Sequence, residues 1–186
     1  MSEGNVEQIA EDLAFVRKAV QRRRGITSLA TNVLWALIIL VGFSMNDFYP
    51  AGVGLFWAIA VPTGMTASGV LYWIAASRAG ERDRTMDRRT MMHWLGLGVA
   101  IGLTFLLVAC RAVDEQALGL PLLIILALAY YLAGVHLDSS YLWAGMVMAA
   151  GAVAAIFIRD YFATMLGVAV SAALILGGIL RSRRNG

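Results

Sequence analysis

The chain is poor in the residues from which catalytic and metal sites are built. Its 186 residues include one cysteine, Cys110, two histidines and three prolines. A single thiol excludes an intramolecular disulfide and any zinc or iron–sulfur site that needs several thiolates. The sequence also lacks a nucleophile motif and a Gly-rich phosphate loop after a strand. We therefore expect a protein that is not an enzyme, with no catalytic, cofactor-binding or metal-binding residues.

Charged residues are also missing from the middle of six long apolar runs. Hydrophobic residues make up 60% of the chain, more than a soluble domain of this length uses. Each run is close to the roughly 20 residues that cross a hydrocarbon core of about 30 Å. A charge at mid-depth marks many pumps, proton-coupled carriers and voltage sensors, so its absence counts against those classes. The runs cover about residues 26–45, 50–77, 91–110, 117–136, 141–158 and 161–180.

The cationic residues lie almost entirely on one side of these runs. Thirteen of the fifteen Lys and Arg residues fall within 17–24, 78–89 and 181–184, and only Arg111 and Arg159 fall on the other side. The positive-inside rule assigns the richer side to the cytoplasm. Fourteen of the fifteen are arginine, a usage typical of GC-rich bacterial genomes. We expect a multi-pass protein of the bacterial cytoplasmic (inner) membrane, with a cytoplasmic N-terminus and a cytoplasmic C-terminus.

These observations predict an all-α fold, a polytopic six-transmembrane-helix bundle with a cytoplasmic amphipathic N-terminal helix. Three parts follow: the helix at 1–25, the transmembrane domain at 26–180 and a basic tail at 181–186. The predicted outer loops are so short that spans 1 and 2, 3 and 4, and 5 and 6 should be antiparallel neighbours. Aromatic residues including Trp94, Tyr130 and Tyr141 are expected in a belt at the inner interface, and Phe48 and Tyr161 at the outer one.

Small residues recur at a spacing of four within the spans. Close backbone approach drives helix association in lipid, so these pairs predict contacts between helices of the bundle. The pairs are Gly64 and Ser68, Gly98 and Gly102, Gly145 and Ala149, Gly151 and Ala155, and Gly167 and Ser171.

Three further residues in or near the spans allow two interpretations each. Pro62 lies inside span 2, where its missing N–H predicts a helix kink. The kink is either a static feature of the bundle or a hinge or cavity wall. His93 and His136 lie at the predicted inner interface. They are either ordinary interfacial side chains, which is our expectation, or a two-ligand metal or haem site.

The residues before the first run predict an amphipathic helix over about residues 5–24. Apolar residues recur there at spacings of 3, 4, 3 and 4, which is the a/d pattern of a helix with one apolar seam. Three roles remain open: a helix lying on the membrane or packed on its own bundle, a docking site for a cytosolic protein, or self-association between protomers. We assign partner binding to the seam, defined as Val6, Ile9, Leu13, Val16 and Val20.

The stretch from Glu11 to Val20, EDLAFVRKAV, followed by six spans resembles the opening of small, uncharacterised bacterial integral membrane proteins. The resemblance covers about ten residues plus the topology. It carries no activity and no catalytic residue. Some proteins of this kind accompany winged-helix regulators, so the resemblance implies a signalling role.

The function expected from the sequence is that of a regulator or adaptor. It would present the N-terminal helix to a cytosolic protein partner or to another protomer of a homo-oligomer. The alternative is a small carrier or channel for an apolar or neutral solute, with Pro62 and the small residues along the path. In both cases the surroundings are the lipid bilayer, and we expect no cofactor and no nucleic acid as partner.

Overall fold

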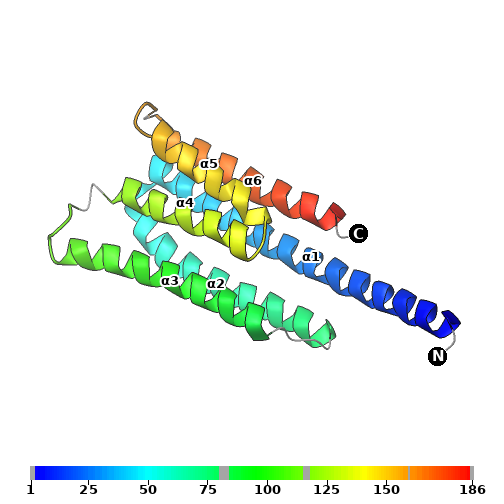
Figure 1. The fold of residues 1–186 in the computed structure, drawn as a ribbon. Coiled ribbons are helices and arrows are strands. Elements are labelled where there is room, and N and C mark those ends of the chain that lie inside the picture. Colours follow the sequence, from blue (N-terminus) through cyan, green and yellow to red (C-terminus); the bar gives the residue numbers. More distant parts are fainter. Residues whose placement is uncertain (1–2, 80–83, 115–117, 159, 185–186) are drawn as a thin grey trace.

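The structure is a computed structural model that describes residues 3–79, 84–114, 118–158 and 160–184. These residues form helices joined by short connections, and no strand occurs among them (Figure 1). The α-helices are α1 (Glu3–Phe48), α2 (Val53–Ala79), α3 (Arg84–Ala109), α4 (Gly119–His136), α5 (Ser140–Ala154) and α6 (Phe162–Arg184). A short 3-10 helix, η1 (Pro50–Gly52), joins α1 to α2.

Helix α1 differs from the sequence prediction, because it joins two elements that we expected to be separate. The amphipathic segment and the first span form one helix of 46 residues, without a break at Gly25. A glycine inside a helix costs only about 1 kcal/mol relative to alanine, and three arginines, which are good helix formers, precede this one. At 1.5 Å per residue α1 is about 69 Å long. Figure 1 shows its N-terminal half continuing beyond the ends of the other helices.

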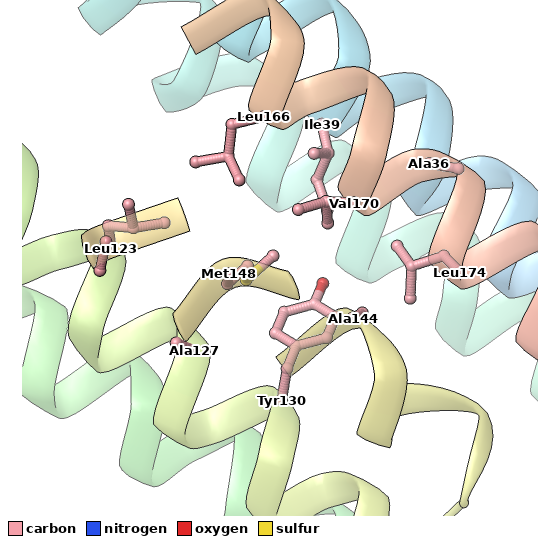
Figure 2. Close-up of a cluster of buried hydrophobic side chains, with 11 residues drawn as sticks. Ala36, Ile39, Leu123, Ala127, Tyr130, Ala144, Met148, Leu166, Val170 and Leu174 are labelled. Atoms are coloured by element: carbon pink, nitrogen blue, oxygen red, sulfur yellow. The ribbon is translucent and has the colours of Figure 1, made fainter. Parts of the chain in front are cut away.

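Four helices, α1, α4, α5 and α6, enclose the buried core (Figure 2). The most extensive contacts are those of α1 with α6 and of α4 with α5, and α5 also packs on α6. We call these helices the four-helix core. The buried side chains are Ala36 and Ile39 of α1, Leu123, Ala127 and Tyr130 of α4, Ala144, Met148 and Ala152 of α5, and Leu166, Val170 and Leu174 of α6.

Helices α2 and α3 lie outside this core. Helix α2 packs on α1, and α3 makes a smaller contact with α4. The neighbour pairs expected from the short loops, α1 with α2, α3 with α4 and α5 with α6, are therefore confirmed. The extensive pairing of α1 with α6 was not predicted. In the spanning part of α3, residues 88–109, none of the residues is buried.

Among the described residues, five helices are long and apolar enough to cross a membrane. They contribute the segments Leu29–Phe48, Pro50–Ile74, Arg88–Ala109, Gly119–His136 and Phe162–Arg183. Helix α5 is also apolar but has only 15 residues, about 22 Å of helix, because turns replace it from Ala155 onward. The span predicted at 141–158 is therefore shorter, as a helix, than the sequence indicated.

The small-residue pairs divide into two groups. A Cβ on Gly64, Gly145, Gly151 or Gly167 would come within 3.0 Å of a neighbouring helix, so these glycines lie where helices touch. At Gly98 and Gly102 of α3 an added Cβ meets no atom within 4 Å. The prediction that this last pair packs inside the bundle was wrong for the described residues, because the α3 face that carries it has no helix against it.

Candidate interaction surface

The candidate surface is the part of α1 that precedes its spanning segment. We call residues 3–28 the N-terminal extension; the spanning segment begins at Leu29. Leu13, the seam residue whose side chain the structure describes, is 65% exposed, and Phe15 is 75% exposed. Residues two apart on a helix point about 200° apart, so α1 is uncovered on opposite sides at this level. The side chains of Val6, Ile9, Val16 and Val20 lie outside the described residues.

Polar contacts attach the spanning part of α1 to its neighbours. The Asn32 side chain is fully buried, and its Nδ2 donates to the Leu174 carbonyl of α6 at 3.2 Å. One turn further, the Ser171 hydroxyl donates to the Ala36 carbonyl at 2.7 Å. On the side facing α2, the Trp35 indole N–H donates to the Ser68 hydroxyl at 3.1 Å. The extension is therefore continuous with a helix whose rotation about its own axis is fixed by contacts with α6 and α2.

Two carboxylates connect helix ends at opposite ends of the bundle. Asp47, near the end of α1, accepts from the backbone N–H of Thr164 at 2.7 Å and from its hydroxyl at 2.6 Å, in the first turn of α6. Asp138, between α4 and α5, forms an ion pair with Arg181 of α6. The Asp138 carboxylate also accepts from the Ser140 N–H and hydroxyl, which begins α5. A helix N-terminus favours such an anionic partner.

Four rings meet near Asp138 and form what we call the aromatic cluster, His93, Trp94, Tyr130 and Tyr141. Trp94 contacts Tyr130 and Tyr141 edge to face, with ring centroids 5.7 and 5.9 Å apart. Tyr130 is only 5% exposed. Three residues that we expected in an aromatic belt thus pack on one another, and they connect α3 to the α4–α5 hairpin. At the other end the rings of Phe48 and Tyr161 contact each other at a tilt of 36°, with centroids 5.8 Å apart.

The two histidines have different surroundings. A ring nitrogen of His93, Nε2, lies 3.0 Å from the Ala129 carbonyl of α4, and the ring packs edge-on against Trp94. His136 is exposed at the end of α4. Among the described residues no group of three or more His, Cys, Asp or Glu side chains could hold a metal ion. His93 thus serves as a contact between α3 and α4.

Pro62 lies inside α2, which continues through it. The Thr66 hydroxyl donates to the Pro62 carbonyl at 2.8 Å. An open depression of about 410 Å³ lies beside these residues, lined by Pro62, Thr63, Thr66 and Ala67. The lining comes from one helix, so this depression is a hollow in the exposed side of α2 and does not cross the bundle.

Sequence reasoning missed Asn32, and it missed the partners of Asp47 and Asp138. Asn32 Oδ1 is buried without a hydrogen-bond partner among the described residues. The signal was present, because an amide inside an apolar run is costly in lipid and so indicates a contact within the protein. The partners could not be inferred, since Thr164 lies 117 residues from Asp47 and Leu174 lies 142 residues from Asn32.

No protein-family model, curated protein or solved structure matches this chain. The class of protein is therefore defined by the fold itself. Most of the described residues are helical, and several of the helices are apolar and long enough to span a membrane. This is the architecture of a multi-pass membrane protein.

Proposed function

We propose that the protein is a non-enzymatic regulator or adaptor of the bacterial inner membrane. In this proposal the N-terminal extension stands in the cytoplasm, and its seam binds a cytosolic protein or a second protomer. The observation that carries the proposal is the continuity of α1 from Glu3 to Phe48 together with the 65% exposure of Leu13. The extension measures about 39 Å at 1.5 Å per residue, enough to reach past the headgroup region.

The unbroken course of helix α1 also bears on the alternative in which the extension lies on the membrane surface. A helix that leaves the bilayer and then lies flat has to bend sharply where it emerges. Such bends occur at proline, at Gly/Ser pairs or at irregular turns. Helix α1 stays helical through Gly25. This favours an extension that projects from the membrane with its sides available to a partner.

Six crossings are part of the proposal, and the polar contacts at the two bundle ends support them. Asp47 brings the start of α6 to the end of α1, and Asp138 brings the end of α6 to the turn between α4 and α5. The chain must therefore pass from one end of the bundle to the other between Asp138 and Thr164. Helix α5 and the turns after it make this passage. Its neighbours α4 and α6 pack against it, so α5 does not have to match the bilayer thickness alone.

The orientation can be tested with single cysteines in a Cys110→Ala background. Ser2→Cys, Thr85→Cys and Ser182→Cys should be protected from an impermeant thiol reagent in intact cells, and Asp114→Cys should react. The physical reason is the distribution of Lys and Arg, thirteen of which lie on the proposed cytoplasmic side. Labelling of Thr85→Cys from outside would overturn this topology.

The function is tested by placing charge in the seam. The double variant Ile9→Asp and Leu13→Asp should lose its partner, because an unpaired charge buried in a contact costs several kcal/mol. The bundle should insert and fold normally, since the contacts described between α1 and its neighbours, which start at Leu29, lie beyond the seam. Partners that co-purify with the intact protein from bacterial membranes are identified by mass spectrometry and compared with those of the variant.

A second variant separates a protein contact from attachment to lipid. Replacing Arg17, Lys18 and Arg22 by Gln leaves the seam intact and removes charge that attracts anionic headgroups. A docked protein should be retained by this variant and lost by the Asp variant. If the Asp variant keeps every partner and its oligomeric state, the adaptor function is wrong and the carrier alternative gains support.

A further inference from the structure

The N-terminal extension continues without a break from a membrane-spanning segment, and this restricts how two copies could meet. Copies inserted in one membrane have the same orientation, so their α1 helices point the same way. Because α1 is one helix from Glu3 to Phe48, each residue of the extension stands at a fixed distance from the bilayer. Two extensions side by side are therefore parallel and in register, before any contact between them is considered.

The seam fits that arrangement. In a heptad Val6, Leu13 and Val20 take the a positions, and Ile9 and Val16 take the d positions. Leu13 is exposed in the single chain, and so is Phe15, which takes position c on the outside of a coiled coil. Arg23 would take the next d position, so the pairing ends after Val20. The segment covers two heptads, which is marginal for free peptides, but membrane anchoring raises the effective concentration.

Charge complementarity distinguishes a parallel pair from other arrangements. In a parallel coiled coil a g residue faces the e residue of the following heptad on the partner helix. Asp12 is at g and Arg17 is at e, five residues later, so opposite charges face each other twice in a symmetric pair. An antiparallel pair would instead bring e positions together with e positions and g with g, so Asp12 would not face Arg17. Within one helix, the positions three and four residues from Asp12 hold no cation, and those around Arg17 hold no anion.

We propose that the extension binds a second copy of this chain as a parallel, in-register coiled coil over Val6 to Val20, with Asp12 of each copy facing Arg17 of the other. This inference rests on the proposed function, because it names the partner of the seam. It differs from that function in needing no cytosolic protein, and its test measures the contact between the two copies directly.

Cross-linking of the full-length protein in its membrane tests the geometry. In the Cys110→Ala background, Ile9→Cys and Val16→Cys place thiols at d positions, where parallel helices bring Cβ atoms close enough for a disulfide. Phe15→Cys is the matched control, one residue away and on the outside of the coil. Mild oxidation should give several-fold more covalent dimer with Ile9→Cys and Val16→Cys than with Phe15→Cys. Equal cross-linking at all three positions, or none, would overturn the proposal.

A charge swap tests the register. Asp12→Arg alone and Arg17→Asp alone should each weaken self-association, on the order of tenfold, because two attractive contacts become repulsive. The double variant Asp12→Arg with Arg17→Asp should restore it, measured by the yield of the Val16→Cys dimer. Failure of the double variant to recover would rule out the parallel register.

The cross-linking and co-purification results together distinguish self-pairing of the extension from binding of a cytosolic protein. If Ile9→Cys and Val16→Cys give no dimer while Ile9→Asp with Leu13→Asp loses a cytosolic protein, self-pairing is wrong and the adaptor function stands. Dimer formation that persists in the Ile9→Asp and Leu13→Asp variant would overturn self-pairing through the seam, and the adaptor function falls as well if that variant also keeps every cytosolic partner.

Discussion

Replacing Gly145 by leucine should force α4 and α5 apart and strongly destabilise the four-helix core. A Cβ at this position would lie 2.4 Å from the Tyr131 backbone nitrogen and 2.7 Å from its Cα. Backbone atoms cannot rotate away as a flexible side chain can, so the helices themselves must shift. Overpacking in a close-packed interior typically costs about 1–3 kcal/mol, and a leucine against backbone belongs at or above the upper end. The loss is measured as a lower unfolding temperature in detergent.

The matched control is Gly98→Leu in α3. An added Cβ at Gly98 meets no atom within 4 Å, and the whole spanning part of α3 is unburied. Leucine there should leave stability unchanged or raise it by up to about 1 kcal/mol, because glycine is the poorer helix former. If the two variants unfold at the same temperature, the assignment of α5 to the core and α3 to the periphery is wrong.

Asp138→Ala should produce the second large effect. The Asp138 carboxylate forms an ion pair with Arg181 of α6 and accepts from the N–H and hydroxyl of Ser140 at the start of α5. The Asp138 side chain is only 12% exposed. Alanine removes the ion pair and the hydrogen bonds to Ser140 together and leaves Arg181 without this partner. We expect a loss of about 2–4 kcal/mol in the free energy of unfolding, since partly buried pairs lose more than exposed ones when one partner is deleted. Thermal or denaturant unfolding in detergent measures the change.

One variant separates the loss of charge at Asp138 from the loss of its hydrogen bonds, and a second is a control at an exposed carboxylate. Asp138→Asn keeps an oxygen to accept from Ser140 but removes the charge, so its loss should be intermediate. Asp160→Ala removes an exposed carboxylate and should change stability by no more than about 0.5 kcal/mol. Equal stability of Asp138→Ala and Asp160→Ala would show that the contact between Asp138 and Arg181 does not hold the end of α6.

The positions of the helices could be read from the sequence because insertion into lipid depends on length and hydropathy, which are local properties. The packing of those helices against one another could not be read from the sequence. Lipid is as apolar as the interior of the bundle, so a lipid-facing leucine and a buried one look alike in the sequence. Gly98 with Gly102 and Gly145 with Ala149 show the same spacing, yet Gly98 faces open space and Gly145 touches the Tyr131 backbone.

The candidate surface was more predictable than the core. The seam follows from a periodicity that appears only where one side of a helix is polar, as in residues 5–24. What the sequence did not indicate is the continuity of α1 through Gly25, because glycine weakens a helix without stopping it. The a/d spacing therefore predicted an amphipathic helix but not its unbroken connection to the spanning segment.

The pairing of α1 with α6 also has a consequence for how the protein is made. Asn32 and the Leu174 carbonyl it binds are 142 residues apart. A ribosome adds about 5–20 residues per second, so roughly 7–30 s pass between synthesis of the two partners. During that interval the buried side of α1 has no α6 to cover it, and the Asn32 amide must be accommodated by lipid headgroups, water or the insertion machinery. Closure of the core is therefore a post-insertion event, governed by the arrival of α6.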